Sequence, residues 1–90
     1  MDATEVDRIV AALRAGRACR VPFCTTLYPD TRALENLLRA RADGGFELTT
    51  TYVEFAAGHG YSTEMHETEA CSEAQVRERL GWATEAEVIA

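Results

Sequence analysis

The chain has 90 residues and contains no lysine, one tryptophan, two prolines and no long run of apolar residues. A helix that spans a bilayer needs about 20 consecutive apolar residues, so the sequence predicts no membrane span. The N-terminal segment MDATEVDR carries neither the basic stretch nor the apolar stretch of a secretory signal peptide. We therefore expect a soluble protein of the cytoplasm.

Cysteine and histidine are also scarce. The three cysteines have no regular spacing, and an odd number does not suggest a disulfide framework, so we expect reduced thiols. A metal site needs three or four converging ligands, and the candidates here are Cys24, His59, His66 and Cys71. These residues form no metal-binding motif such as C-x-x-C. We therefore expect neither a metal nor any other cofactor.

Motifs for catalysis are absent as well. The sequence has no G-x-S-x-G nucleophile motif, no phosphate-binding loop and no dinucleotide fingerprint. His66 together with Glu54 or Glu64 is the pairing that suggests acid–base chemistry. A domain of this length has little room for a ligand-sized pocket. The sequence therefore predicts a protein that is not an enzyme and has no small-molecule substrate.

The apolar residues that are present follow regular periods. Helical spacing predicts helices over residues 4–15, 31–42 and 73–80. Strands are predicted over residues 18–24, 46–55 and 61–70. The expected fold is one α+β domain, residues 1–90, in the order α-β-α-β-β-α. In this fold the helices pack on one face of a short, mainly antiparallel sheet that contains a β-hairpin.

Polar residues mark where these elements begin. Thr4 and Ser72 are expected to cap helices, and Thr84 is expected to open a last helical turn. The apolar residues that face inward in this arrangement make up the predicted core, which consists of Val10, Leu13, Val21, Phe23, Leu34, Leu37, Leu38, Val53, Phe55, Val76 and Leu80.

The hairpin over residues 46–70 has a predicted register. A three-residue turn at 58–60 would place Tyr52 opposite His66, Val53 opposite Met65 and Phe55 opposite Thr63. Glu54 and Glu64 would then face each other on the outer face, which is unfavourable without a cation between them.

Charge is distributed unevenly along the chain. Residues 1–45 carry seven arginines and six acidic residues, a net charge of +1, whereas residues 46–90 carry two arginines and nine glutamates, a net charge of −7. Such an asymmetry indicates an electrostatic partner for the acidic half. The predicted partner-binding residues on the hairpin and the helix after it are Glu54, Glu64, His66, Glu67, Glu69 and Glu73.

Nucleic-acid binding is the alternative. A helix, a strand, a second helix and a hairpin loosely suggest a winged helix, and SEAQVRERLGWATEAEV suggests a helix-turn-helix. The segment TEAEVIA, however, carries glutamates and no basic residue, and it would repel phosphates. The basic residues available for this function are Arg14, Arg17, Arg20, Arg32, Arg39 and Arg41.

We therefore expect a small acidic protein–protein interaction module that acts as a stoichiometric regulator or inhibitor of a basic, nucleic-acid-handling partner. Phage and mobile-element proteins that block host defence, such as anti-CRISPR proteins, share this size and charge, which is an analogy only. The sequence also predicts a homodimer, because Trp82, Val88 and Ile89 are apolar residues beyond the main core.

Overall fold

A computed structural model of the chain describes residues 1–28, 31–55 and 62–89. Within these residues the chain forms two helices and five strands. In chain order they are α1 (Ala3–Arg14), β1 (Ala18–Tyr28), β2 (Thr31–Ala40), β3 (Phe46–Phe55), β4 (Ser62–Cys71), α2 (Glu73–Trp82) and β5 (Glu87–Ile89). The protein is therefore a small α+β domain, as predicted, with more strand than the sequence suggested.

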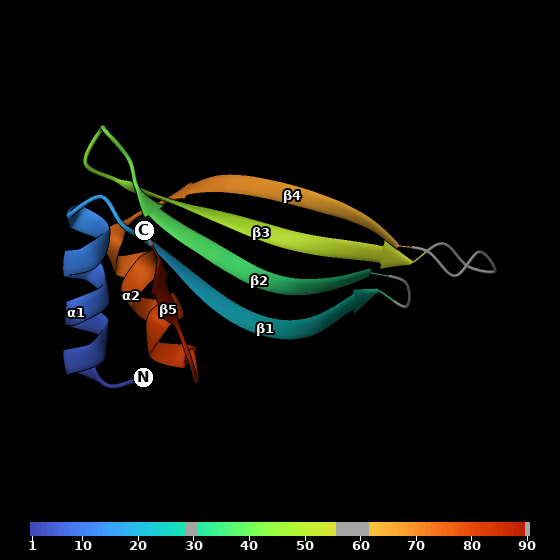
Figure 1. The fold of residues 1–90 in the computed structure, drawn as a ribbon, viewed down its shortest axis with the longest axis horizontal. Coiled ribbons are helices and arrows are strands. Elements are labelled where there is room, and N and C mark those ends of the chain that lie inside the picture. The colour runs from blue at the N-terminus through green and yellow to red at the C-terminus, as the bar shows by residue number, and fades with distance from the viewer. Residues whose placement is uncertain (29–30, 56–61, 90) are drawn as a thin grey trace.

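The strands form one antiparallel sheet in the order β4-β3-β2-β1-β5 (Figure 1). The first four strands lie beside one another in the order in which they follow along the chain. Strand β5 returns from the C-terminal end and pairs with β1 only at Ala18, Cys19 and Arg20. In the described part of the chain, one edge of the sheet is therefore β4, and the other is β5 together with the remainder of β1.

Local sequence signals explain where the helices begin and end. The side chain of Asp2 accepts a hydrogen bond of 2.9 Å from the backbone N–H of Glu5, so α1 begins before the predicted Thr4 cap. Ser72 and Gln75 form the capping box expected at the start of α2. Gly16 follows α1 with a positive φ of 93°, a conformation that ends helices and favours glycine. Neither helix is long and apolar enough to cross a membrane.

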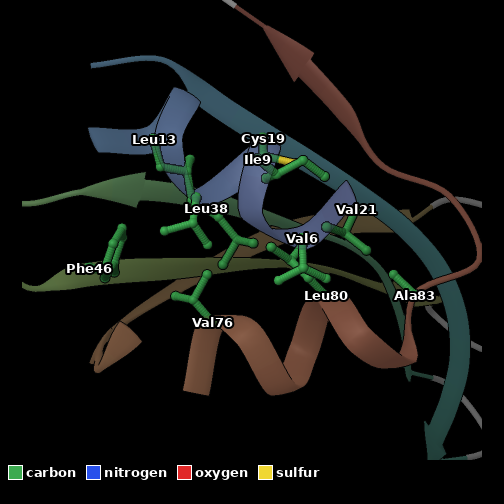
Figure 2. Close-up of a cluster of buried hydrophobic side chains, with 11 residues drawn as sticks. Val6, Ile9, Leu13, Cys19, Val21, Leu38, Phe46, Val76, Leu80 and Ala83 are labelled. Carbon is green, nitrogen blue, oxygen red and sulfur yellow. The ribbon is translucent and has the colours of Figure 1, made fainter. Parts of the chain in front are cut away.

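The core lies between the two helices and one face of the sheet (Figure 2). Its buried members are Val6, Ile9, Val10, Leu13, Cys19, Val21, Leu38, Phe46, Val76, Leu80 and Ala83. Cys19 pairs with Leu38 in the register of the sheet, and Ala40, two residues further along, pairs with Phe46. Paired residues share a face, so the strands contribute to the core from one face only. We call it the helix-side face and the other the opposite face.

The helices cover only part of the sheet. Both lie at one end of it, and the four long strands continue beyond them (Figure 1). The molecule is accordingly elongated, with extents of 45 × 27 × 22 Å. We call the rows around Leu38 and Phe46 the covered end, and the rows around Ala33, Tyr52 and Met65 the open end.

The helix predicted over residues 31–42 is wrong, because Thr31–Ala40 forms the central strand β2. Leucines at helical spacing gave this segment a helical pattern, but strands on both sides satisfy its backbone, and such tertiary pairing overrides local propensity. Two features obscure the alternation of apolar and polar residues that is typical of a strand. Asn36 occupies a buried position, and the register between β2 and β3 shifts between Ala33 and Glu35. The predicted order of elements is corrected to α-β-β-β-β-α-β.

The helical turn predicted after Thr84 is also wrong, because Glu87–Ile89 forms strand β5. Val88 lies opposite Cys19 and packs against the core cluster. Two β-branched residues in succession favour a strand, and the free edge of β1 supplies its partner. The helix-turn-helix suggested for this segment is therefore not formed, and neither is the winged-helix order.

The hairpin of β3 and β4 is confirmed, but its predicted register is wrong by one residue. Tyr52 lies opposite Met65, Val53 opposite Glu64, and Glu54 opposite Thr63. Register depends on the turn, and a shift by one residue moves side chains to the other face. The predicted turn at 58–60 lies outside the described residues. Glu54 and Glu64 consequently lie on different faces of the sheet, and the predicted repulsion between them is absent.

The predicted core is correct for six residues and wrong for three, and the side chains of the other two are not described. Val10, Leu13, Val21, Leu38, Val76 and Leu80 are buried, as predicted. Leu34 is 37% exposed, and Leu37 and Val53 are only half-buried. Leu37 and Val53 lie on the opposite face of the sheet, which the helices do not cover, and Leu34 lies at the register shift between β2 and β3. The side chains of Phe23 and Phe55 lie outside the described part of the chain.

Candidate protein-binding surface

Strand β4 is an edge of the sheet along its whole length. Its ten residues pair with β3, and no strand within residues 1–28, 31–55 and 62–89 pairs with its other side. An edge strand presents a row of backbone N–H and C=O groups that can accept another strand. The predicted binding residues of the hairpin therefore lie on or beside a backbone that is itself able to bind.

The register divides the predicted acidic residues between the two faces. On β4, Glu67 and Glu69 belong to the helix-side face, since they lie opposite Thr50 and Leu48. Glu64 belongs to the opposite face. All three side chains are exposed. Glu54 of β3 lies on the helix-side face at the open end, one residue past Val53. The structure thus brings Glu67 and Glu69 together and separates Glu64 from them.

His66 lies on the opposite face with Glu64. Its Nε2 is 3.6 Å from Oε2 of Glu64, and its Nδ1 is 3.1 Å from the hydroxyl of the buried Thr51. Both ring nitrogens therefore have neighbours within the sheet. This arrangement orients the ring across β4 and β3, away from the groove described below.

Glu73 lies apart from the strand residues, in an ion-pair network that joins the two helices. Its carboxylate accepts hydrogen bonds from Arg14 of α1 at 3.1 Å and from Arg77 at 3.3 Å. These arginines, Arg14 first, lower the pKa of the Glu73 carboxyl. Arg77 also reaches Asp7 of α1 at 2.6 Å. Glu73 therefore contributes to helix packing, and its charge is already paired.

Sequence reasoning predicted Glu73 of α2 but missed the flank of this helix that lines a groove. A groove of about 260 Å³ lies between the C-terminal part of β4 and one flank of α2. Its lining residues are Leu48, Glu69, Ala70, Cys71, Gln75, Glu78, Arg79 and Trp82. The helix residues among them recur at i, i+3, i+4 and i+7, which marks one flank of a helix. That spacing, with a tryptophan among polar residues, was the signal available in the sequence.

Trp82 is the most exposed large apolar side chain of this groove, with 75% of its surface accessible. It lies on the last turn of α2, beside the groove and away from the core residues Val76 and Leu80. A large exposed aromatic side chain beside a polar groove is typical of binding surfaces, where tryptophan is enriched.

The charges around the groove are mostly negative. Glu69 and Glu78 line it, and Glu67 lies on the same face of β4. Arg79 is the basic residue of the groove, and its Nε donates to Oδ1 of Asn36 at 2.6 Å. Partial burial lowers the pKa of the Arg79 guanidinium. Arg79 is thus held against the sheet by a buried amide.

The arginines proposed for nucleic-acid binding are scattered. Ion pairs hold Arg14 to Glu73 at 3.1 Å, Arg20 to Glu35 at 3.0 Å, and Arg41 to Asp43 at 3.4 Å. Arg14 also donates to the carbonyl of Gly44 and lies over the ring of Phe46.

The remaining arginines lie on several elements. Arg17 is exposed in the loop after α1. Arg32 and Arg39 lie on β2, on the opposite face of the sheet, which they share with Arg20. Arg20, Arg32 and Arg39 therefore share one face, but Arg32 lies at the open end and Arg39 at the covered end of the sheet.

The candidate metal ligands do not converge within the described residues, where no group of three or more histidine, cysteine or acidic side chains could hold a metal ion. Cys71 and His66 lie five residues apart on β4, on different faces of the strand. The side chain of Cys24 and the whole of His59 lie outside the described part. Burial raises the pKa of the Cys71 thiol, so it stays protonated near neutral pH.

Together these features provide unpaired strand backbone, carboxylates and an exposed indole beside a groove. Such groups recognise a chain with hydrogen-bonding backbone and positive charge. Comparison of the sequence with protein-family models and curated proteins, and of the fold with solved structures, finds no match.

Proposed function

We propose that the protein is a small acidic interaction module that binds a basic surface of a protein partner and acts as its stoichiometric regulator or inhibitor. The observation that carries this proposal is the grouping of Glu69, Glu78 and the exposed Trp82 around one groove, with Glu67 next to Glu69 on the same face of β4. Binding alone suffices for this function, and no catalytic step is part of it. A partner that handles nucleic acid fits best, since such proteins carry basic surfaces.

Electrostatics explains how the surface would act. The net charge of the chain is −6, and residues 46–90 carry the excess of glutamate. A face of one charge sign speeds the encounter with an oppositely charged partner, and salt weakens this effect. Exposed ion pairs are individually worth roughly 0–1 kcal/mol, so the cluster should matter more than any one carboxylate.

Affinity capture with matched variants tests the proposal. The wild type, Glu67→Gln/Glu69→Gln and Glu5→Gln/Glu85→Gln are immobilised and exposed to lysate of the source organism, and captured proteins are eluted with increasing salt. Both double variants remove two negative charges, but only the first alters the groove. We expect the wild type and the control to retain the same basic protein, and the groove variant to release it at lower salt. Equal elution from all three would contradict the proposal.

Nucleic-acid binding is the second candidate, and the observation that favours it is that Arg20, Arg32 and Arg39 share the opposite face of the sheet. Acids on the same face, such as Glu35 at 3.0 Å from Arg20, oppose it. Fluorescence anisotropy of a DNA duplex separates the candidates. If this face binds phosphates, Arg32→Glu/Arg39→Glu abolishes binding and Glu67→Gln/Glu69→Gln does not. If the wild type leaves the anisotropy unchanged at physiological salt, this candidate is excluded.

Self-association is a further part of the proposal. Val88 and Ile89, two of the three residues that suggested it, belong to β5, so truncation after Gly81 would also remove a strand. Of the three residues, Trp82 is the one whose side chain is exposed. Light scattering should therefore compare the wild type with Trp82→Ala, which leaves β5 in place. A wild type that scatters as a monomer at high concentration would exclude the homodimer.

A further inference from the structure

We propose that the partner is bound as an extended basic segment, which adds to the sheet as a further strand beside β4 and places alternate side chains in the groove under α2. The inference rests on the proposed function, in which the acidic groove is the binding surface, and it specifies the conformation of what is bound. Three features of the structure support it: the free edge, the charge pattern along it, and the position of α2.

The free edge supplies the backbone partner. Strand β4 is ten residues long and is paired on one side only within the described chain. An added strand would lie about 4.8 Å away and exchange main-chain hydrogen bonds with it. The opposite edge of the sheet is less suited. There β5 already occupies Ala18–Arg20 of β1, and Pro22 has no N–H to donate.

The charge pattern selects a basic occupant. Glu67 and Glu69 are two residues apart on the helix-side face, and Glu64 is exposed on the opposite face. A strand with basic side chains at alternate positions would place them beside Glu67 and Glu69. A second copy of β4 would instead bring glutamates of two chains together, which is unfavourable. Charge complementarity therefore argues for a basic segment and against self-pairing of β4.

The position of α2 supplies the side-chain contacts. Gln75, Glu78 and Trp82 lie on the flank of α2 that faces the end of β4 across the groove. Side chains of an added strand that point to the helix-side face would enter this groove. Arginine side chains suit it, because they pair with carboxylates and stack on indole rings. Leu48 and Cys71 provide the apolar part of the groove.

Peptides with blocked backbone donors test the added strand. The probe is an acetylated and amidated decapeptide of alternating arginine and threonine. Two analogues carry N-methyl groups, on all arginines in one and on all threonines in the other. Because alternate N–H groups of a strand point to opposite sides, only one analogue has methyl groups directed at β4. All three peptides keep their side chains and charge. Binding is followed by the fluorescence of Trp82, the single tryptophan of the chain.

We expect the unmethylated peptide to bind and to change the Trp82 emission. One methylated analogue should bind at least about tenfold more weakly, since several hydrogen bonds of roughly 1 kcal/mol each are lost. The other should stay within about threefold of the parent, because its methyl groups face solvent. If both analogues bind as the parent does, or if the parent does not bind, strand addition is overturned.

The same titration with the glutamine variants separates this inference from the proposed function. Glu67→Gln/Glu69→Gln should weaken binding of the unmethylated peptide about tenfold, whereas Glu5→Gln/Glu85→Gln should leave it nearly unchanged. If the groove variant weakens binding but both methylated analogues bind fully, the acidic surface stands and the added strand does not. If the groove variant and the control bind equally, the proposed surface itself fails. Circular dichroism checks that each variant is folded.

Discussion

The two ends of the sheet differ in what stabilises them. At the covered end, Leu38 and Phe46 are fully buried under both helices. At the open end, Leu34 is 37% exposed and Met65 is 38% exposed. The covered end gains its stability from burial of apolar surface, whereas the open end depends on the hydrogen-bond ladders of four long strands. The candidate groove also lies at the covered end, because Leu48 and Cys71, which line it, pair with Leu38 and Phe46.

The boundary between the two ends coincides with irregular strand pairing. The register of β1 against β2 shifts between Pro22 and Thr25, and that of β2 against β3 shifts between Ala33 and Glu35. Such bulges increase the local twist and bend the strands. The strands curve as they leave the helices (Figure 1). The bulges thus lie at the place along the strands where the sheet no longer packs against the core.

The largest expected effect is a difference in the free energy of unfolding between alanine substitutions of two leucines in β2. Leu38→Ala removes a side chain that is 0% exposed at the covered end, and we expect it to lower the free energy of unfolding by about 2–5 kcal/mol. Leu34→Ala, at the edge of the open end, should cost less than about 1 kcal/mol. Urea denaturation of both variants measures the difference. Equal losses would mean that the open end is packed as tightly as the covered end.

The next largest expected effect tests the boundary between the covered end and the open end of the sheet. Asn36 is 4% exposed, and it donates to the Thr50 hydroxyl at 3.0 Å and accepts from Arg79 at 2.6 Å. Asn36→Ala leaves both partners without this amide, and we expect a loss of about 1–3 kcal/mol in the free energy of unfolding. Thr49→Ala is the control, because the Thr49–Thr68 contact is exposed. A smaller loss for Asn36→Ala than for Thr49→Ala would contradict the role given to this buried amide.

The sequence predicted the covered end better than the open end, and the reason is physical. Helix caps and apolar periodicity are local, so α1, α2 and the range of β3 could be predicted from them. Strand β2 could not, because its leucines fit a helix and only the neighbouring strands decide otherwise. Strand β5 likewise depends on the free edge of β1, which no local pattern shows.

The candidate site was predicted only in part. Glu67 and Glu69 alternate along a strand, and that pattern was visible in the sequence. Their separation from Glu64, and the pairing of Glu73 with arginines, depend on register and helix packing. The contribution of Trp82 required knowing that α2 folds back beside β4. Contacts between segments far apart in the chain are what sequence patterns do not contain.

A smaller effect is the pH dependence of the free energy of unfolding that arises from the ion pairs of Glu73 between the two helices. The Glu73 carboxyl has a lowered pKa, chiefly through the hydrogen bond from Arg14. Its stabilising contribution is therefore present above its ordinary pKa of 4.5 and is lost as pH falls through the lower pKa of the folded state. Glu73→Gln should make the free energy of unfolding less dependent on pH in that acidic range. Urea titrations across the range, with Glu85→Gln as control, measure this, and equal pH profiles for the two variants would contradict it.

The smallest expected effect lies at the open end itself. Met65 is 38% exposed on the helix-side face and lies opposite Tyr52. Met65→Thr keeps a residue that favours strands, so we expect the free energy of unfolding to change by less than about 0.5 kcal/mol. The measurement is urea denaturation of wild type and variant at two protein concentrations. We expect this difference in the free energy of unfolding to be the same at both concentrations, because Met65 is exposed at the open end. A loss above about 2 kcal/mol that grows with concentration would show that another copy packs on the open end, and the two ends of the sheet would then both be buried in the assembled protein.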